Sequence, residues 1–154
     1  MTFHLHLDSE TLGRIRTSAV FDVAPHETLR EVLQGMRTGR RASVLVCQDG
    51  RLLGIFTERD AVRLMADPQN LDKPIESLMT ANPRTVNATE TVGRAIELMS
   101  RGGYRRLPIL DAEGKPSAMV KVSHVLHYLV QHFPKIIYNL PPKPHLKTQE
   151  REGA

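Results

Sequence analysis

The residue types best suited to chemistry lie in the heptapeptide at positions 54–60, which reads GIFTERD. An apolar, strand-like stretch runs here into a helix-like stretch, so Thr57 is predicted at the N-terminus of a helix. Free backbone N–H groups at such an end attract an anion, and Thr57 adds a hydroxyl group. Asp60, one turn further on, can accept hydrogen bonds from both hydroxyls of a ribose. The heptapeptide therefore indicates a site for a sugar phosphate.

The same two side chains also fit a purely structural role. Thr57 and Asp60 have the spacing of a capping box, in which a threonine at the N-cap and an acid at the third helical position satisfy each other's backbone N–H groups. The spacing does not separate the two interpretations. They can coexist, because one threonine can cap a helix and still face a ligand.

Part of the positive charge is gathered in two clusters. The chain has 21 Lys and Arg against 17 Asp and Glu, a formal net charge of +4. The clusters are Arg37, Arg40 and Arg41, then Arg101, Arg105 and Arg106. A nucleic-acid-binding stripe usually carries more charge along one face, often with interleaved aromatic side chains. Nucleic-acid binding through these arginines is therefore the weakest of the binding hypotheses.

Composition limits the class of protein. The 154 residues are 40% hydrophobic, 25% charged and 5% aromatic, which excludes a disordered chain and leaves apolar material for an aliphatic core. No apolar run approaches the ~18 residues of a membrane span, and the N-terminus lacks the basic start and apolar stretch of a secretory signal. Cys47 is the only cysteine, so an intramolecular disulfide is excluded and a reduced, cytoplasmic setting is expected.

An internal repeat organises the chain. Residues 15–36 match residues 78–99 at an offset of 63, and one extra residue in the second copy then changes the offset to 64. The apolar pattern stays in phase over about fifty residues, which indicates a duplicated unit. Aligned pairs include Thr17 with Thr80, Val23 with Val86, Glu27 with Glu90, Ile55 with Met119 and Val62 with Leu126.

Each copy predicts the same five elements: a short strand, an amphipathic helix, two strands and a second helix. The fold class is therefore predicted as α+β, an α/β sandwich type with two β-α-β-β-α repeats. The predicted strands are 19–23, 43–47 and 52–56 in the first copy, and 84–86, 107–110 and 117–120 in the second. The expected segments are an N-terminal piece at 1–13, repeats at 14–67 and 78–133, a linker at 68–77 and a proline-containing tail at 134–154.

Over residues 14–133 these features resemble a tandem pair of CBS domains, also called a Bateman module. The resemblance rests on the duplication, the Gly54-x-x-Thr57-x-x-Asp60 pattern and the string YRRLPILD at 104–111. It implies two repeats packed sheet to sheet with pseudo-twofold symmetry, and clefts between them that bind adenosine nucleotides such as AMP, ADP or ATP. Some members of the family bind S-adenosylmethionine and some bind nothing. The resemblance further implies a regulatory module, often homodimeric.

Mapped residue by residue, the resemblance favours one cleft. It implies that Asp60 holds the ribose hydroxyls, that Thr57 lies near the phosphate, and that Arg105 and Arg106 reach the phosphate from the opposite repeat. Guanidinium groups suit phosphate oxygens physically. An adenine pocket is expected from the first and third strands, and each of its candidate positions is equally explained as core. The candidates are Val20, Phe21, Val23 and Ile55.

The second cleft departs from this pattern. Lys121 stands where the first copy has Thr57, and His124 stands where it has Asp60. Because no carboxylate is present for a ribose, this cleft is expected to be empty or to bind something different, although Lys121 can still reach a phosphate. Its expected partners from the opposite copy are Ala42 and Ser43, with Arg40 and Arg41 just before them.

Catalytic and metal chemistry find little support. His124 and His127 share a helix face, yet a metal site needs a third ligand with suitable geometry, so surface histidines are the favoured interpretation. Ser43 and Ser123 have no Gly-x-Ser-x-Gly setting and no evident base. No catalytic residue, metal ligand or required cofactor is expected, and the chain is not expected to be an enzyme.

The leading hypothesis is therefore a stand-alone regulatory CBS pair. It would bind an adenosine nucleotide between Asp60 and the Arg105–Arg106 pair and signal to an unknown effector protein, as a cytoplasmic homodimer without membrane contact. The alternative is a ligand-free structural module whose amphipathic helices form the dimer. The sequence leaves open which nucleotide is bound.

Overall fold

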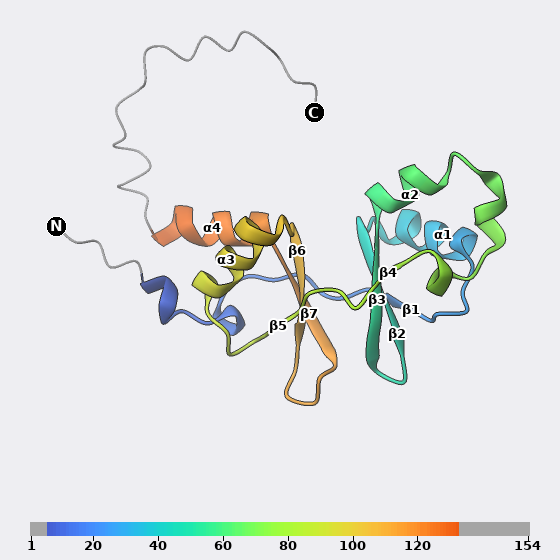
Figure 1. The fold of residues 1–154 in the computed structure, drawn as a ribbon. Coiled ribbons are helices and arrows are strands. Elements are labelled where there is room, and N and C mark those ends of the chain that lie inside the picture. Colours follow the sequence, from blue (N-terminus) through green and yellow to red (C-terminus); the bar gives the residue numbers. More distant parts are fainter. Residues whose placement is uncertain (1–5, 133–154) are drawn as a thin grey trace, which may run out of the picture.

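The computed structural model describes residues 6–132, which form two similar halves lying side by side (Figure 1). The first half contains β1 (Asp22–Val23), α1 (Leu29–Gly39), β2 (Ser43–Gln48), β3 (Arg51–Thr57) and α2 (Glu58–Leu64). The second contains β5 (Val86–Asn87), α3 (Val92–Gly102), β6 (Arg106–Leu110), β7 (Pro116–Lys121) and α4 (Val122–His132), whereas β4 (Thr80–Ala81), which precedes them in the chain, lies in the first half beside β3 (Figure 1). The predicted α+β fold with two β-α-β-β-α repeats is confirmed. The predicted tail at 134–154 lies outside the described residues.

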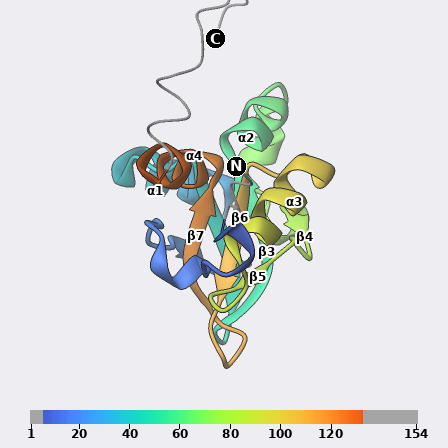
Figure 2. The same cartoon turned by 90° about the vertical axis from the view of Figure 1, so that its left-hand side faces the viewer.

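Two small sheets form the centre of the described part. One has the order β1-β2-β3-β4 and the other β5-β6-β7. In each, the first strand runs parallel to the next and the hairpin that follows is antiparallel. Two views at right angles place the helices toward one end of the hairpins β2–β3 and β6–β7 and the hairpin turns at the other end (Figures 1 and 2).

Local sequence explains why α1 and its counterpart α3 begin and end where they do. Thr28 caps α1 in a capping box with Glu31, and Thr91 caps α3 by accepting a hydrogen bond from the Arg94 N–H. The helices end in left-handed residues, Arg40 with φ 50° in one copy and Gly103 with φ 69° in the other. Each helix buries one apolar stripe against its own sheet; the buried members are Leu29, Val32 and Met36 in α1, and Val92 and Ala95 in α3.

The two halves exchange their lead-in segments, which we define as residues 12–18 and 75–81. Leu12 is fully buried in the core of the second repeat, and Ile75, its equivalent 63 residues later, is fully buried in the core of the first. Strand β4 pairs with β3 through Gly54 and Ala81, although it leads into the second repeat. Each hydrophobic core is therefore completed by chain from the other repeat.

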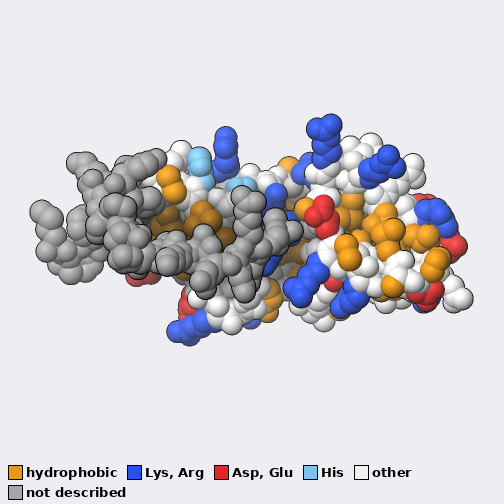
Figure 3. Space-filling view, turned by 90° about the horizontal axis from the view of Figure 1, so that it is seen from above, with side chains coloured by type: hydrophobic (Ala, Val, Ile, Leu, Met, Phe, Trp, Pro, Cys, Tyr) orange, Lys and Arg blue, Asp and Glu red, His pale blue; other side chains and the backbone are white. Residues whose placement is uncertain are grey.

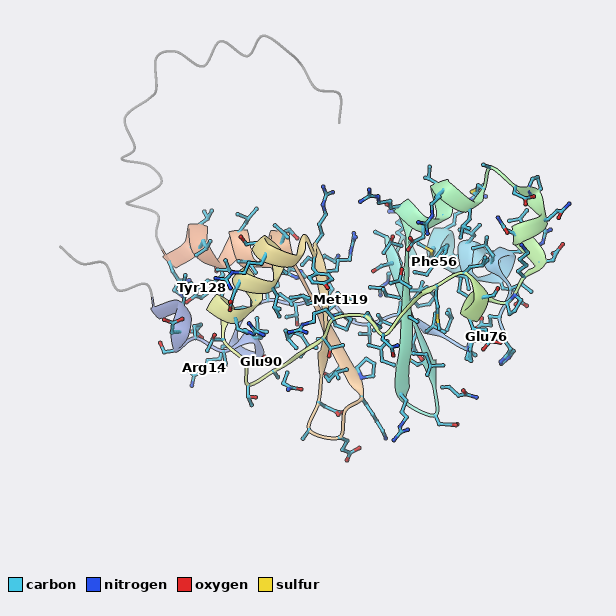
Figure 4. The ribbon with its side chains drawn as sticks, in the orientation of Figure 1. Arg14, Phe56, Glu76, Glu90, Met119 and Tyr128 are labelled. Atoms are coloured by element: carbon cyan, nitrogen blue, oxygen red, sulfur yellow. The ribbon has the colours of Figure 1, made fainter. Side chains whose placement is uncertain are left out.

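The reciprocal contact is made by Ser18 and Met119. Their backbones form an antiparallel bridge with two N–H···O bonds of 2.9 Å, which adds the first lead-in segment to the sheet of the second repeat. Met119 lies on β7 where the two halves meet (Figure 4). The two crossed pairings give the predicted pseudo-twofold arrangement, and they decide which side chains share a cleft.

Candidate ligand-binding clefts

The N-terminus of α2 forms the capping box that the sequence allows. The Asp60 carboxylate atom Oδ2 accepts hydrogen bonds from the Thr57 backbone N–H and from the Thr57 hydroxyl, both at 3.0 Å, and the Asp60 N–H donates to the Thr57 hydroxyl oxygen at 3.4 Å. Within residues 6–132, the second carboxylate oxygen, Oδ1, pairs with the exposed guanidinium of Arg63, at 3.4 Å. The box therefore orients the Asp60 carboxylate and does not use Oδ1.

A cleft of about 520 Å³ lies beside this capping box, and we call it the Asp60 cleft. Its walls come from both repeats. The first repeat contributes Ile55, Thr57, Glu58, Arg59 and Asp60, and the second contributes Thr80, Gly103, Tyr104, Arg105 and Arg106. Five of the eight predicted nucleotide-binding residues are thus brought together. Seen from above, basic side chains gather where the two halves meet (Figure 3).

Positive charge gathers on one wall of the Asp60 cleft. Arg59, Arg105 and Arg106 line the cleft against two acids, Glu58 and Asp60, and no ion pair within residues 6–132 neutralises any of the three arginines. The Arg106 Nε atom is buried and has no hydrogen-bond partner in the described part of the chain. A buried donor without a partner costs about 1–3 kcal/mol. Since α2 has only seven residues, we assign the attraction for an anion to the arginines rather than to the helix end.

The structure separates the four residues expected to form an adenine pocket. Val20 and Phe21 line the second cleft, not the Asp60 cleft, and Val23 is buried in the core of the first repeat. The reason is the exchange of lead-in segments: β3 lies between β2 and β4, so the outer neighbour of Ile55 is β4 and not β1. Of these four candidates only Ile55 lines the Asp60 cleft.

Sequence reasoning missed several residues of this wall. Thr80 pairs with Ile55 across β3 and β4 and lines the cleft, as do Tyr104, Glu58 and Arg59. The offset of 63 aligns Thr80 with Thr17, so applying the repeat symmetry to the lead-in segments would have indicated Thr80. Tyr104 directly precedes the arginine pair, and its exposed ring supplies an aromatic surface.

The second cleft has a volume of about 130 Å³, and we call it the Lys121 cleft. Lys121 and the lead-in residue Ser18 line it, together with residues 40–43 before and at the start of β2. His124 repeats the contact that Asp60 makes, since its Nδ1 accepts a hydrogen bond from the Lys121 N–H at 3.0 Å. Its Nε2 lies 3.3 Å from the Ser18 hydroxyl oxygen.

His124 experiences both burial and positive charge. Burial is the larger cause of a pKa below the ordinary 6.5, and the charges of Lys121 and Arg16 lower the pKa further. The Nδ1 atom must also be unprotonated to accept the Lys121 N–H. The neutral imidazole is therefore the form that fits this position.

Other candidate chemistry within residues 6–132 is sparse. His124, His127 and His132 line a further cavity, but the described residues contain no group of three or more His, Cys, Asp and Glu that could hold a metal ion. Burial, with the charge of Asp22 second, raises the pKa of the Cys47 thiol to about 11. No helix in the described range is long and apolar enough to span a membrane.

Two β-α-β-β-α repeats that exchange their lead-in segments and form two clefts between them define a distinct class of small module. The chain belongs to the CBS domain family, whose sequence model matches residues 12–67 and 75–131. The two matches reproduce the two repeats, and they include Leu12 and Ile75 at their first positions.

Comparison with known proteins agrees with this membership. The chain is 31% identical over 120 residues to an uncharacterized 17.7 kDa protein of Acidianus ambivalens, covering 77% of this chain and 73% of that protein. It is 32% identical over 115 residues to the CBS domain-containing protein CBSCBSPB1 of Arabidopsis thaliana, covering 72% of this chain and 21% of the plant protein. The chain thus spans about a fifth of that relative.

Solved structures show the same fold. The structure of CBSX2 in complex with AMP is similar with a TM-score of 0.70 at 23% identity, and the match covers 80% of this chain and 98% of CBSX2. At this level of identity the likeness concerns the fold.

Proposed function

We propose that this CBS pair binds an adenosine nucleotide in the Asp60 cleft and acts as a regulatory module. The observation that carries the proposal is the meeting of Asp60 from one repeat with Arg105 and Arg106 from the other, with a buried Arg106 Nε that has no partner within residues 6–132. A phosphate oxygen would satisfy that donor, and the Asp60 carboxylate would accept from ribose hydroxyls.

Size and surface chemistry support a nucleotide. About 520 Å³ falls within the range of roughly 300–1,000 Å³ that small-molecule sites occupy. Ile55 and the ring of Tyr104 offer apolar and aromatic surface for a base. The related fold of CBSX2 was solved with AMP, which makes AMP the first ligand to test, ahead of ADP, ATP and S-adenosylmethionine.

The regulatory mechanism follows from the origin of the walls. A ligand that touches Asp60 and Arg106 bridges the two repeats, so it favours whichever relative arrangement of the repeats it binds more tightly. An effector protein that recognises that arrangement would receive the signal. The residues in this cleft bind and orient a nucleotide, and no catalytic step is assigned to them.

Calorimetric titration with AMP, ADP, ATP and S-adenosylmethionine tests the proposal. We expect at least one of these ligands to bind with a dissociation constant below about 1 mM. Asp60→Asn keeps an oxygen for the helix cap but removes the charge, and we expect it to weaken binding at least tenfold, about 1.4 kcal/mol. Asp72→Asn, which changes an exposed aspartate paired with Arg30, is the matched control and should bind normally.

Two results would refute the nucleotide site. The first is no binding of any of the four compounds at millimolar concentration. The second is equal affinity of the wild type and Asp60→Asn. In either case the alternative of a ligand-free structural module would gain support.

The helix surfaces support a homodimer as the assembled form. Val62 and Met65 on α2 are 77% and 58% exposed, and Leu126 and Val130 on α4 are 56% and 43% exposed. Hydrophobic side chains are visible over the first half in the view from above (Figure 3). Grouped apolar surface of this kind usually marks an interaction site. Light scattering on the wild type and on a Val62→Lys, Leu126→Lys double variant tests the dimer, which the variant should dissociate.

A further inference from the structure

The Lys121 cleft collects positive charge without any acid to neutralise it. Arg40, Arg41 and Lys121 line it, together with the hydroxyls of Ser18 and Ser43, and no aspartate or glutamate is among its lining residues. None of the three cations takes part in an ion pair within residues 6–132. Three unpaired cations around a small concavity are a favourable setting for an anion.

Arg40 and Arg41 follow directly after α1, and the backbone at this helix end brings both to the cleft. Arg40 has a left-handed conformation with φ 50°, which ends the helix, and the Arg41 N–H donates to the Met36 carbonyl at 2.8 Å. The Arg41 guanidinium also donates to the Ala19 carbonyl at 3.4 Å, so it is tied to the opposite wall of the cleft. The Arg41 guanidinium is therefore held across the cleft, Lys121 is half-buried, and Arg40 is exposed at its rim.

The Lys121 cleft is smaller than the Asp60 cleft and lacks its carboxylate. Its volume is about 130 Å³ against about 520 Å³ for the Asp60 cleft, and sites for drug-sized ligands begin at roughly 300 Å³. The position that would hold a ribose carries His124, whose ring nitrogens already contact the Lys121 N–H and the Ser18 hydroxyl. The cleft thus has the charge for phosphate groups, less room than the Asp60 cleft and no carboxylate for a ribose.

We propose that the Lys121 cleft binds a small phosphate oxyanion, inorganic phosphate or pyrophosphate, without a nucleoside. This inference goes beyond the nucleotide function of the Asp60 cleft and does not depend on it. Arg41 and Lys121 supply charge-assisted hydrogen bonds to the oxyanion, and the Ser43 hydroxyl supplies a neutral one.

His124 lies in the same region of positive electrostatic potential. His124 lies beside Lys121 and Arg16, with His127 next on its helix, and these charges add to burial in lowering its pKa. Across the neighbouring cavity it is faced by Glu10, Arg14 and His132. An anion in the Lys121 cleft would offset part of the positive charge, so the pKa of His124 should rise when the anion binds.

The test is titration of the full chain with sodium phosphate and, separately, pyrophosphate at low ionic strength, followed by calorimetry. We expect at least one anion to bind with a dissociation constant below about 1 mM and to lose at least tenfold in affinity in Lys121→Met. Lys115→Met is the matched control. Lys115 is an exposed lysine directly before the first residue of β7, whereas Lys121 is the last residue of that strand. Arg41→Gln is a second cleft variant, for use if far-UV circular dichroism shows that Lys121→Met is not folded.

A spectroscopic readout is independent of calorimetry. Proton NMR of the histidine rings across pH should show an upward shift in the pKa of His124 at saturating anion, and no such shift in Lys121→Met.

The outcomes separate this site from the nucleotide site. Binding that survives in Asp60→Asn and is lost in Lys121→Met supports the inference even if no nucleotide binds. The inference is wrong if neither anion binds at millimolar concentration, if Lys121→Met binds like the wild type, or if Arg105→Gln alone removes binding. AMP binding with a stoichiometry of two would also overturn it, because a nucleoside would then fit the Lys121 cleft.

Discussion

The Thr57 hydroxyl oxygen and the Asp60 Oδ2 atom lie 3.0 Å apart across the first turn of α2, and both residues line the same cleft. One pair of side chains thus caps a helix and forms a wall of the candidate site. Any substitution of either residue acts on stability and on ligand affinity together, so the two effects must be measured separately.

Removing the cap should destabilise the fold. Thr57→Ala is expected to lower the free energy of unfolding by about 1 kcal/mol, because it removes the hydroxyl that accepts the Asp60 N–H. Thr57→Ser should retain most of the stability. Urea denaturation measures both. Thr38→Ala, at an exposed position inside α1, is the control, and a loss there as large as in Thr57→Ala would contradict the capping role.

Arg106 should show opposite effects on stability and on binding. Arg106→Met removes a buried Nε that has no partner within residues 6–132, so the ligand-free protein is expected to be as stable as the wild type or up to about 1 kcal/mol more stable. AMP affinity should fall at least tenfold, about 1.4 kcal/mol. Denaturation and calorimetry on the same preparations measure the two effects.

The control for Arg106 is Arg51→Met, which changes an exposed arginine at the start of β3. It should leave both quantities unchanged. A large loss of stability in ligand-free Arg106→Met would show that Arg106 has a structural role instead.

The exchanged lead-in segments should couple the two cores. Leu12→Ala and Ile75→Ala are each expected to lower the free energy of unfolding by about 2–5 kcal/mol, because each removes a fully buried aliphatic side chain. The protein should still unfold in one transition, since each residue belongs by sequence to one repeat and by packing to the other.

Ser100→Ala provides the comparison for these core variants. Ser100 is an exposed residue of α3, so its replacement should change stability by about 0.5 kcal/mol or less. Two separate unfolding transitions, with only one of them sensitive to Leu12→Ala, would contradict the coupling.

His124 should make stability depend on pH. Its pKa is lowered in the folded state, first by burial and then by Lys121 and Arg16, so the unfolded chain binds the proton more readily. Stability is therefore fully present above the ordinary pKa of 6.5 and is lost as the pH falls from that value toward the lower folded pKa. His124→Asn keeps an oxygen acceptor for the Lys121 N–H and should flatten the loss.

The pH effect is measured by urea denaturation above and below the ordinary histidine pKa. His26→Asn, at an exposed position before α1, should retain the wild-type dependence. If His124→Asn loses as much stability on acidification as the wild type does, another group is responsible.

The two clefts should communicate through the backbone. The Glu58 N–H donates to the Ala42 carbonyl at 3.0 Å, and the Val122 N–H donates to the Arg105 carbonyl at 3.1 Å. Glu58 begins α2 at the Asp60 cleft, and Ala42 lies directly before β2 at the Lys121 cleft. Val122 begins α4 next to Lys121, and Arg105 lies directly before β6 at the Asp60 cleft. We expect saturating pyrophosphate to change AMP affinity about fivefold or more, and calorimetry of Lys121→Met should show no change on adding pyrophosphate.

The helices and strands of the two repeats could be predicted from the sequence, because each has a local pattern of apolar residues and each pattern occurs in both copies. Helical stripes such as Leu29, Val32 and Met36 recur in the second copy, so each element is supported by an independent instance. The meeting of Thr57 and Asp60 with Arg105 and Arg106 followed from recognising the repeat family, and the structure places all four on one cleft.

The exchange between repeats was not accessible in the same way. A strand of two residues such as β4 has no periodicity from which its partner sheet can be predicted. Val20 and Phe21 are apolar residues that could line either cleft, so their residue types do not indicate which one. Leu12 and Ile75 lie in short 3₁₀ turns outside the periodic helices, so their burial leaves no pattern. Tertiary packing, and not local sequence, determines which core each lead-in segment completes.

The exchanged lead-in segments resemble the exchanged elements of a domain-swapped dimer. A single repeat, separated from its neighbour, would lack the lead-in segment that completes its core. Its own lead-in segment would have no core to fill. Two separate repeats could then complete each other only by association, and their stability would depend on concentration. Residues 68–74, by tethering the two repeats, turn that association into an intramolecular event. Cutting the chain within this connector should therefore leave two fragments that hold together through the exchanged segments.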